Sequence, residues 1–543
     1  MSGPQETIVI GGMKLEIPPE ERTPLVDQLL RIILQQQQEI EQLREEIRRL
    51  KGLPELPKRP PRPSTLNDPQ GKPSRKNKKQ KRKRGKRPGS QKRRKDLKID
   101  ETVKLQLDDL PEGSKLHGYE DFFVQDLDIG PHNTRYRRAR YKLPDGSWAM
   151  APLPPQVNSH FGPGLRSYVL YQHHQNHVTQ PLLLEELGEF GVDISAGQID
   201  RLLTEGHDAF HQEKDALLPA AREVSKYLQT DDTSARHQGR NGHTLHIGND
   251  WFAAFFTSDT KSRVNFLEVL RGPFDDYVVG GDALFYMEKH GLPKYLLQRI
   301  GGELGEDEYW ELSGQEAWRE QLDAWKITSD EHRRIVTEGA LFGSLMAHDL
   351  CGQALISDDA KQFKILGFMH GLCWVHSERH VAGLIPLNER ERKAHDRVRD
   401  EIWQYYQRLK AYRDAPTARR KTRLERDFDR LFLQRTGYPE LNDALRKIHG
   451  KREQLLLVLE HPEIPLHNNL SENDIRQYVK KRKISGGTRS ELGRRCRDTF
   501  LSLKTTCRKL GVTFWAYLRD RINGANEIPP IPELLRQAAT AQS

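Results

Sequence analysis

Hydrophobic positions near the start of the chain recur at alternating spacings of three and four residues. The pattern runs from about Pro24 to about Lys51, and the flanking positions are mostly Gln, Glu and Arg. Spacing of this kind makes a continuous seam on one side of a helix, which is how coiled-coil partners meet. We therefore predict a helix that pairs two copies of the chain, with a single amphipathic helix packed on its own protein as the alternative. The seam consists of Val26, Leu29, Ile33, Gln36, Ile40, Leu43, Ile47 and Leu50.

A second pattern, typical of strands, begins at residue 227. Short runs rich in β-branched and aromatic residues cover Tyr227–Ser234, His243–Asn249 and Trp251–Ser258, and a helical stretch over Lys261–Leu270 follows. Polar or glycine-containing turns separate the runs, which favours three consecutive antiparallel strands. Three antiparallel strands followed by a helix is how a ribonuclease-H-like domain begins, so we predict an α/β core of that class.

Long helical regions are expected to interrupt the rest of this core. The apolar run Ala354–Ile356 predicts a buried strand, and Gly371–His376 predicts the next one. Helical patterns over about residues 271–350 and 381–460 separate these strands from the first three and from the C-terminal part of the chain. The predicted catalytic domain therefore carries two large helical insertions.

Residues 166–220 are predicted to be helical and to include a helix-turn-helix over Gln180–Leu203. Leucines give the first helix an apolar face, Gly191 permits the turn, and Ser195 can cap the second helix. A recognition helix of this kind enters the major groove of DNA, although many helical hairpins share the pattern. The candidate DNA-binding residues of this helix are Ser195, Gln198 and Arg201.

Three histidines precede the helix-turn-helix. His173 and His177 have the helical i, i+4 spacing that can bind a metal ion, and His174 lies between them. No third ligand is nearby in the sequence, so we expect these histidines to lie on the surface or to face DNA.

The basic charge of the chain is concentrated in one segment. The net charge is +10, but residues 72–95 carry fifteen Lys or Arg and no acid, which leaves the rest of the chain at −5. Residues 52–98, rich in Pro, Lys, Arg and Gly, cannot bury enough apolar surface to fold alone. A dense cationic run releases counterions when it binds DNA or RNA. We predict a basic, disordered linker that contacts nucleic acid; a solubilising linker is the other interpretation.

The segment between this linker and the helices, residues 99–165, is predicted to be a strand-rich, DNA-binding module. Its basic, aromatic stretch Arg135–Tyr141 either contacts a phosphate backbone or forms one solvated face of a hairpin. Phe122–Gln125 and Tyr136–Tyr141 have strand-like composition, and Pro144–Gly146 forms a turn. A further short strand is predicted at Thr7–Ile10.

Cysteine usage and hydropathy bound the setting of the protein. Its four cysteines form no CxxC pair, and they are too few for a disulfide framework, so a reducing, cytoplasmic compartment fits best. No window approaches about eighteen consecutive apolar residues, so we expect no membrane span. The N-terminus lacks the charged and apolar pattern of a secretory signal.

Three acidic positions occur where the predicted fold would bring them together. Asp231 lies in the middle of the first core strand, Asp358 at the end of the fourth, and Glu472 in the first turn of a later helix that Asn469 or Ser471 can cap. Three carboxylates can hold two Mg²⁺ or Mn²⁺ ions about 4 Å apart, which serve phosphoryl transfer. Spacing alone does not single out these three, because the chain has 77 acidic residues.

Basic residues follow Glu472 on the same predicted helix. Arg476 is one turn further and Lys480 two turns further, so both can share the face of Glu472 and hold a DNA phosphate. Arg482 and Lys483 continue this run and are candidate DNA-binding residues as well.

Several separated segments resemble the IS66-type insertion-sequence transposases of the DDE superfamily. They are LQTDDTSARHQGRNGHTLHIGND, NFLEVLRG, LISDDAKQF with HGLCWVHSERH, and PLHNNLSENDIRQYVKKRKISGGTRSELG. The resemblance covers roughly residues 110–518, and the last segment is the most distinctive, because Asn-Asn-x-x-Glu before a basic helix is that family's third acidic site. The resemblance implies that Asp231, Asp358 and Glu472 are the catalytic residues and the metal ligands.

Neighbouring acids remain alternatives. The resemblance favours Asp358 for the second place because HGLCWVHSERH follows it, and within that run His376 and Arg379 either contact DNA or brace the site. Many family members carry a cysteine-rich zinc module, but no cysteine precedes Cys351, so no zinc is expected. The alternative acids are Asp232, Asp359 and Asp282.

The resemblance implies a DNA transposase that binds the ends of its element and catalyses metal-dependent hydrolysis and strand transfer. Its expected partners are terminal inverted repeats, target DNA, further copies of itself and small accessory proteins, in the cytoplasm with the nucleoid. The alternatives are a DNA-binding regulator and a ribonuclease-H-like nuclease without strand transfer. The predicted domains are residues 1–51 (coiled coil), 52–98 (linker), 99–165 (strand-rich module), 166–220 (helix-turn-helix region), 221–518 (catalytic domain) and 519–543 (tail).

Overall fold

The structure is a computed structural model. It describes residues 129–154, 159–302, 308–365 and 367–541 continuously, together with residues 7–10, 13–16 and 99–105, short runs between residues 23 and 39, and residues 119 and 127. The chain divides into two compact units, of which the smaller comprises residues 59–135 and 189–192. The predicted basic linker, the strand Phe122–Gln125 and the second half of the coiled-coil seam, from Ile40 on, lie outside the described residues.

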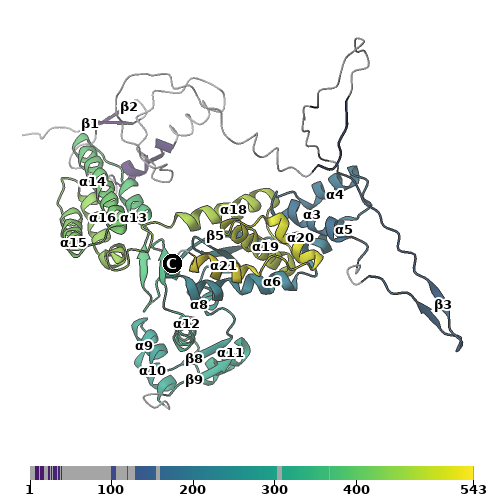
Figure 1. Cartoon of the computed structure of the whole chain (residues 1–543). Helices are drawn as coiled ribbons and strands as arrows, with labels where there is room; N and C mark the ends of the chain where they lie inside the picture. Colours follow the sequence, from purple (N-terminus) through teal and green to yellow (C-terminus); the bar gives the residue numbers. More distant parts are fainter. Residues whose placement is uncertain are drawn as a thin grey trace, which may run out of the picture. The chain divides into compact units, whose positions relative to one another are not determined.

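The larger unit is built around a five-stranded mixed sheet (Figure 1), whose strand order is β11–β10–β5–β6–β7. Neighbouring strands among β5, β6 and β7 are antiparallel, whereas β10 and β11 run parallel to β5. The strand that contains Asp231, β5, is therefore the central one. The bounds are β5 Tyr227–His237, β6 Arg240–Gly248, β7 Ala253–Ser258, β10 Ala354–Ser357 and β11 His370–Leu372.

Local sequence accounts for most of these strands. β10 is buried at every position, as its apolar run predicts. β5 and β6 are joined through Gln238 and Gly239, whose φ angles of 48° and 77° suit a tight hairpin turn. The first three predicted strands are confirmed. The predicted strand Gly371–His376 is too long, because helix α13 (Trp374–Ala382) begins two residues after β11 ends.

One edge of the sheet, strand β7, is covered by helix α19 (Glu491–Lys509). Three backbone N–H groups of β7 donate to α19 side chains, at 3.1, 2.9 and 2.7 Å. The acceptors are four residues apart on the helix, about 6 Å, and the donors are two residues apart on the strand, about 6.8 Å, so the two rises nearly match. This cover protects the edge from pairing with another chain. The pairs are Ala253 with Thr506, Phe255 with Ser502, and Thr257 with Asp498.

Helix α18 (Asn469–Ser485) packs against the same face of the sheet as α19. Ile475 and Tyr478 of α18 share a buried cluster with Phe255 of β7 and Leu501 of α19. The predicted caps, Asn469 and Ser471, are wrong: the residue before the helix is Asn468, and no side chain caps it. The polar side chains at this end are instead hydrogen-bonded to the sheet.

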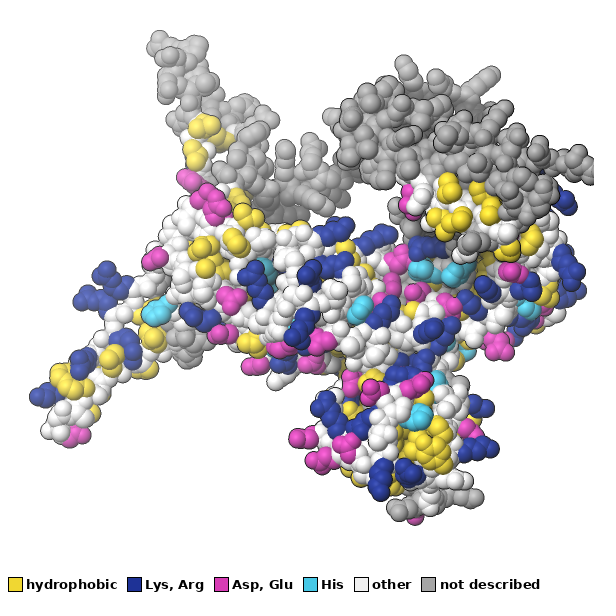
Figure 2. Space-filling view, turned by 180° about the vertical axis from the view of Figure 1, so that it is seen from behind, with side chains coloured by type: hydrophobic (Ala, Val, Ile, Leu, Met, Phe, Trp, Pro, Cys, Tyr) yellow, Lys and Arg dark blue, Asp and Glu magenta, His cyan; other side chains and the backbone are white. Residues whose placement is uncertain are grey.

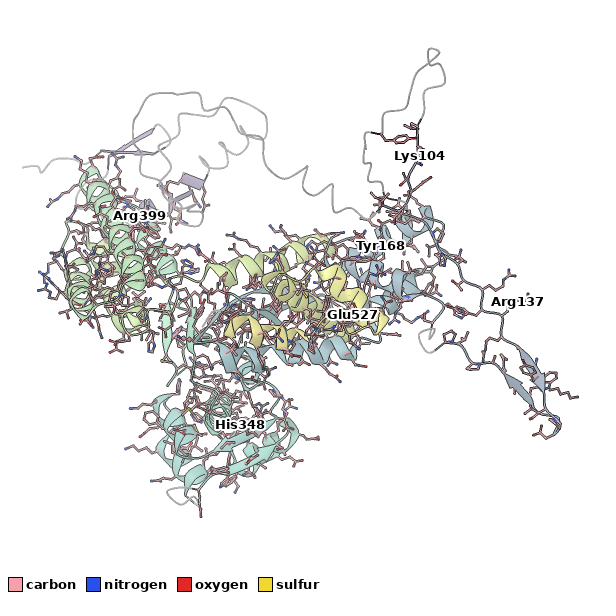
Figure 3. All side chains as sticks on the ribbon, in the orientation of Figure 1. Lys104, Arg137, Tyr168, His348, Arg399 and Glu527 are labelled. Atoms are coloured by element: carbon pink, nitrogen blue, oxygen red, sulfur yellow. The ribbon has the colours of Figure 1, made fainter. Side chains whose placement is uncertain are left out.

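The first insertion forms a small lobe with strands of its own (Figure 1). The purely helical prediction for this region is wrong, because β8 and β9 pair antiparallel. His348, labelled in Figure 3, follows the last helix and lies 2.9 Å from the carboxylate of Asp276 in β8. Helix α8 (Arg263–Arg271) precedes the lobe, as predicted, and the elements of the lobe are β8 Asp276–Val279, α9 Gly281–Lys289, α10 Lys294–Gly301, β9 Trp310–Ser313, α11 Gln315–Ala324 and α12 Asp330–Ala347.

The second insertion is helical, as predicted. Trp374 of α13 lies at its centre, with ring centroids 5.4 Å from Tyr405 and 6.1 Å from Phe428. The same hydrophobic core includes Ile356 of β10, so these helices are packed onto the sheet. Arg399, labelled in Figure 3, is 2.5 Å from Glu378 and joins α14 to α13. The further helices are α14 Glu389–Asp414, α15 Ala418–Phe432, α16 Pro439–His449 and α17 Arg452–Leu455.

The helices predicted before the sheet are present. Gly191, between α4 and α5, has a φ of 80°, which suits the predicted turn. Part of the predicted C-terminal tail is also helical, and Arg536 of α21 forms an ion pair with Glu223 of α7 at 2.6 Å. The bounds are α3 Pro163–His174, α4 Gln180–Glu189, α5 Ala196–Thr204, α6 Asp208–Asp215, α7 Leu217–Val224, α20 Phe514–Asn523 and α21 Ile531–Thr540.

The histidine prediction is wrong for His174. Its ring is buried and lies 4.4 Å from the ring of Phe500, because α3 packs on α19 there. His177 follows the end of α3 with a φ of 64°. It does not share a helix with His173, so the two side chains lack the helical i, i+4 relation that their spacing allows.

Shorter strands occur near the N-terminus and before α3. β1 (Thr7–Ile10) confirms the predicted strand and pairs with β2 (Met13–Glu16). β3 (Arg140–Lys142) and β4 (Trp148–Met150) form a hairpin around the predicted turn, so the strand predicted from residue 136 begins later. Within the smaller unit, the ammonium group of Lys104 lies 6.0 Å from the ring centroid of Tyr119 (Figure 3). Among the described residues, no helix is long and apolar enough to span a membrane.

Candidate active site

Asp231 and Asp358 lie on neighbouring strands at the centre of the sheet. Asp231 is in β5, opposite His246 of β6. β10 runs parallel to β5 with Ile356 beside Gln229, and Asp358 follows two residues later. Neighbouring strands are about 4.8 Å apart. The backbone register therefore brings Asp358 alongside the position of Asp231.

Glu472 reaches the same region because the start of α18 is anchored on β5. The side-chain amide of Asn468 donates to the backbone carbonyl of Thr230 at 2.7 Å, and the backbone N–H of Asn468 donates to Cys373 Sγ at 3.3 Å. Thr230 precedes Asp231, and Glu472 lies one turn after Asn468 in the first turn of the helix. Asn468, which sequence reasoning did not single out, thus joins the helix to the strand.

The three carboxyl groups are close enough to influence one another. The pKa of Asp231 is raised to about 7, first by burial and then by the negative charges of Asp358, Asp232 and Glu472. The backbone N–H of Asp232 donates to Asp231 Oδ1 at 2.8 Å and acts in the opposite direction. An ionised Asp231 is therefore unfavourable here unless a cation offsets the charge.

Glu472 has a buried oxygen, Oε1, that accepts no hydrogen bond from the described residues. His376 Nε2 and Arg379 Nη2 of α13 each lie 3.8 Å from it, which is beyond hydrogen-bond distance. Burial, followed by the charge of Arg379, lowers the pKa of His376. Both basic residues of the HGLCWVHSERH run therefore border the third acid.

Two of the alternative acids are already paired with lysines. Asp232 Oδ1 lies 2.8 Å from Lys261 Nζ, and its side chain points to the opposite face of β5 from that of Asp231. Asp359 lies 2.7 Å from Lys364 Nζ and 2.5 Å from Lys451 Nζ. Burial alone would raise the pKa of Asp359, but these two lysines hold it below its usual range.

Asp282, the third alternative, lies elsewhere. It is in the first turn of α9, within the lobe that contains β8 and β9. Asp358, by contrast, follows the strand β10 that pairs with β5. The geometry therefore groups Asp358, and not Asp282, with Asp231.

The donor set suits a hard divalent cation. Mg²⁺ prefers carboxylate oxygens and keeps water molecules in its remaining positions. A cation would satisfy the buried Glu472 Oε1 and offset the charge that disfavours ionised Asp231. Among the described residues, no three His, Cys, Asp or Glu side chains are already gathered around one point.

Comparison with known proteins decides the family. The family model described as "Transposase IS66 family" matches residues 343–495, which include Asp358 and Glu472 but not Asp231. An uncharacterized protein of Sinorhizobium fredii, y4jO, is 39% identical over 327 residues, which cover 60% of this chain and 100% of that protein. The chain belongs to the IS66 transposase family. The resemblance noted in the sequence is thereby confirmed, and DNA is the partner that a transposase family implies.

A buried network of hydrogen bonds and ion pairs lies next to the acidic site of this transposase and joins β6, α18 and α19. His246, the cross-strand neighbour of Asp231, is 3.0 Å from Ser471 Oγ and 3.2 Å from the carboxylate of Asp474. Lys509 of α19 lies 2.6 Å from the same carboxylate. Burial would raise the pKa of Asp474, but His246 and Lys509 hold it below its usual range. Sequence reasoning missed this network because its members come from three distant segments.

The predicted DNA-binding residues of α18 fall into two groups. Arg476, Lys480 and Lys483 are exposed and accessible to a ligand. Arg482 instead donates to the backbone carbonyl and the hydroxyl of Ser234 in β5. Its guanidinium group therefore helps to hold the helix on the sheet.

The predicted DNA-binding residues of α5 have a structural task as well. Ser195 Oγ accepts from the backbone N–H of Gln198 at 3.3 Å, and Gln198 Oε1 accepts from the backbone N–H of Ser195 at 2.8 Å. This reciprocal pair is a capping box. Arg201, one turn further, is exposed.

Proposed function

We propose that this member of the IS66 family is a DDE-type DNA transposase in which Asp231, Asp358 and Glu472 hold two divalent ions. One observation carries the proposal: the strand register brings Asp358 alongside Asp231, and the start of α18, with Glu472 in its first turn, is hydrogen-bonded to Thr230 beside Asp231. The raised pKa of Asp231 agrees with this grouping of carboxyl groups. Partly buried like charges are costly unless an opposite charge joins them. The neighbouring acids Asp232 and Asp359 are already paired with lysines, so they do not require a cation to offset their charge.

A ribonuclease-H-like core is the fold that the proposal requires. The strand order β11–β10–β5–β6–β7 supports it, because the first three strands along the chain are antiparallel and the two later ones run parallel to the central strand. In such a core the first and fourth strands each carry one acid and a later helix carries the third.

The proposed reaction has two stages. Water attacks a phosphodiester at the end of the element and frees a 3′-hydroxyl, which then attacks target DNA. Mg²⁺ or Mn²⁺ ions supply activation of the attacking oxygen and stabilisation of the leaving oxygen when they are bound. Asp231 and Asp358 are the ligands from the sheet, and Glu472 is the ligand from α18. No covalent protein–DNA intermediate is required, so no Ser or Tyr nucleophile takes part.

Basic groups near the carboxylates would hold the DNA. Arg379 is about half exposed beside Glu472, and a guanidinium group can bind phosphate oxygens through two parallel hydrogen bonds. Helix α18, which carries Glu472, also presents the exposed basic residues Arg476, Lys480 and Lys483. The helical hairpin of α4 and α5 and the basic linker are further proposed DNA contacts, and the N-terminal heptads would pair protomers.

The proposal is tested by a Mg²⁺-dependent cleavage and joining assay on DNA that flanks this gene. The full-length chain is compared with Asp231→Asn, Asp358→Asn and Glu472→Gln, and with the matched control Asp359→Asn, whose acid is paired with lysines. We expect the three variants to lose cleavage and joining and the control to retain both.

Other outcomes would favour the alternatives. Cleavage by the wild-type chain without joined products supports a nuclease. Binding of DNA with equal and negligible cleavage by every variant and the wild type supports a DNA-binding regulator.

A further inference from the structure

A second cluster of side chains that carry the same charge, here positive, lies toward the C-terminal end of α18. A pocket of about 440 Å³ is enclosed by α3, α5, the C-terminal half of α18 and the start of α19. Its lining includes the positive side chains Lys481, Arg489 and Arg497 and one acid, Asp200. Asp200 already accepts a hydrogen bond from Gln180 Nε2 at 2.9 Å. The pocket is therefore electropositive.

The cations that form this pocket are not balanced by acids. Lys481 is only 4% exposed, and its ammonium group donates to the backbone carbonyl of His173 at 2.7 Å. Arg497 Nη1 donates to the carbonyl of Gly486 at 3.0 Å. In the part of the chain that the structure describes, neither side chain forms an ion pair with Asp or Glu. Burial, followed by the charges of Arg497 and Lys504, lowers the pKa of Lys481 to about 7.

Of two other largely buried lysines in α19, one is paired with an acid and one, near Lys481, has no acidic partner among the described residues. Lys509 of α19 is paired with Asp474 at 2.6 Å. Lys504, one turn earlier on α19, donates only to the carbonyl of His174, at 2.7 Å. The uncompensated charge is therefore local to this end of α18, where an anion would be stabilised by several cations at once.

The rim of the pocket is a glycine-containing loop that is fixed to the sheet. Two backbone hydrogen bonds of 2.9 and 2.8 Å join Thr488 to the end of β5. A Cβ atom at Gly487 would lie 2.4 Å from the carbonyl oxygen of Arg236, so this close approach requires glycine. Ser490 then caps α19. The exposed Arg489 is thus held at the pocket edge by a rigid backbone.

The distribution of exposed charged side chains does not by itself identify a DNA-binding surface on this protein. Figure 2 shows Lys and Arg side chains distributed over the visible face among many acidic side chains. A pocket that contains several cations and a single, hydrogen-bonded acid is a more specific feature than any of these surface groups.

We propose that this pocket binds a phosphate group of the DNA backbone through Lys481, Arg489 and Arg497. The proposal rests on the function proposed above, because it takes DNA as the ligand. Guanidinium groups present N–H donors that match phosphate oxygens, and the lysine adds a compact positive charge. Lys481 follows Glu472 by nine residues on one helix, about 14 Å along its axis. That length corresponds to about four base pairs of duplex, so the pocket would fix DNA close to the acidic site.

The test measures DNA binding by the full-length chain without divalent ions, so that no cleavage occurs. The probe is a fluorescently labelled duplex from the flank of this gene, and its anisotropy is followed over a range of NaCl concentrations. We expect Lys481→Met and Arg489→Gln each to weaken binding about five- to tenfold and to reduce the slope of log affinity against log salt by about 1. Lys481→Met is also expected to keep or raise the melting temperature, because it removes an unpaired buried charge.

Matched controls separate the pocket from general effects. Arg319→Gln removes an exposed arginine from α11, and Lys214→Met removes a buried lysine that is paired with Asp215. Both should leave the salt slope unchanged. Unchanged affinity and slope in both pocket variants would overturn the proposal, and so would an equal loss in the Arg319→Gln control.

A second arm separates DNA from free anions. Melting temperatures are compared in inorganic phosphate and in chloride at equal ionic strength. A phosphate-dependent rise that Arg489→Gln abolishes, together with weaker DNA binding, supports the proposal. The same rise with unchanged DNA binding would reassign the pocket to a free anion and overturn the DNA assignment. If Asp231→Asn cleaves DNA at the wild-type rate, the catalytic proposal fails, whereas the binding result for the pocket stands independently.

Discussion

The two ends of helix α18 hold clusters of opposite charge. At its first turn, Glu472 shares its surroundings with Asp231 and Asp358. Toward its last turn, Lys481 shares its surroundings with Arg497 and Lys504. The helix dipole favours negative groups at the N-terminus and positive groups at the C-terminus, so each cluster lies at the end that tolerates its sign.

In the middle of the same helix, a buried negative charge is paired with positive groups. Asp474 is buried, but Lys509 and His246 lie 2.6 and 3.2 Å from its carboxylate. Pairing of this kind stabilises the packing of α18 on the sheet and leaves nothing for a ligand to neutralise. We infer that unpaired like charges mark the ligand sites of this transposase, and paired charges mark its supports. Four predictions test that distinction.

The largest effect is expected for the three acids that no basic side chain contacts within hydrogen-bond distance in the described part of the chain. Changing Asp231, Asp358 or Glu472 to its amide should lower the rate of Mg²⁺-dependent cleavage about 10³-fold or more, since several kcal/mol of transition-state stabilisation is lost. Initial rates on flanking DNA measure this. Asp359→Asn, which removes a paired acid, should lower the rate less than about tenfold. A comparable loss in that control would remove the distinction between paired and unpaired acids.

The paired acid should matter most for stability. Asp474→Asn leaves Lys509 buried without its partner, and breaking a buried ion pair from one side costs about 3 kcal/mol. Equilibrium unfolding in urea should show this loss of stability. A variant as stable as the wild type would mean that the pair does not support α18.

In metal-free buffer, Asp231→Asn should raise the stability of the folded protein instead of lowering it. Because its folded pKa is raised from 3.8 to about 7, the folded state loses stability as pH rises between these values. Above pH 7 the amide should therefore be more stable than wild type by on the order of 2 kcal/mol. Mg²⁺ should raise the melting temperature of the wild type only. A Mg²⁺ response equal in both proteins would contradict the assignment of Asp231 as a ligand.

The smallest effect concerns Lys481. Its folded pKa is lowered from 10.5 to about 7, by burial and then by Arg497 and Lys504. The unfolded chain therefore binds the proton more tightly, and stability should rise with pH between these two values. Lys481→Met should remove that rise, so the unfolding free energies of the variant and the wild type should change differently with pH across this range. Identical pH profiles would show that Lys481 is not destabilised by its neighbours.

The sequence predicted the parts of the fold that local pattern controls. The strands around Asp231 and Asp358 follow from runs of apolar and β-branched residues, and Glu472 was correctly expected in the first turn of a helix. The family resemblance then selected these three acids from the others. Their positions on neighbouring elements follow from strand order, which a single sequence does not state.

Contacts between distant segments were beyond the reach of local pattern. No local pattern singled out Asn468, whose side chain is hydrogen-bonded to β5. The strands β8 and β9 were missed because each is only four residues long and they pair across a helical segment. Arg482 stays a predicted DNA-binding residue, and its contact with Ser234 was not foreseen. In each case the partner lies far away along the chain, so tertiary packing decides the outcome.

The most direct test of the central claim is a titration of Mn²⁺ into the full-length protein without DNA, in which the electron paramagnetic resonance signal of free Mn²⁺ is followed. We expect the wild type and Asp359→Asn to bind Mn²⁺ alike, and Asp231→Asn, Asp358→Asn and Glu472→Gln each to bind it at least about tenfold more weakly, a loss of about 1.4 kcal/mol. If all three variants bind Mn²⁺ as the wild type does, these carboxylates do not form a shared cation site.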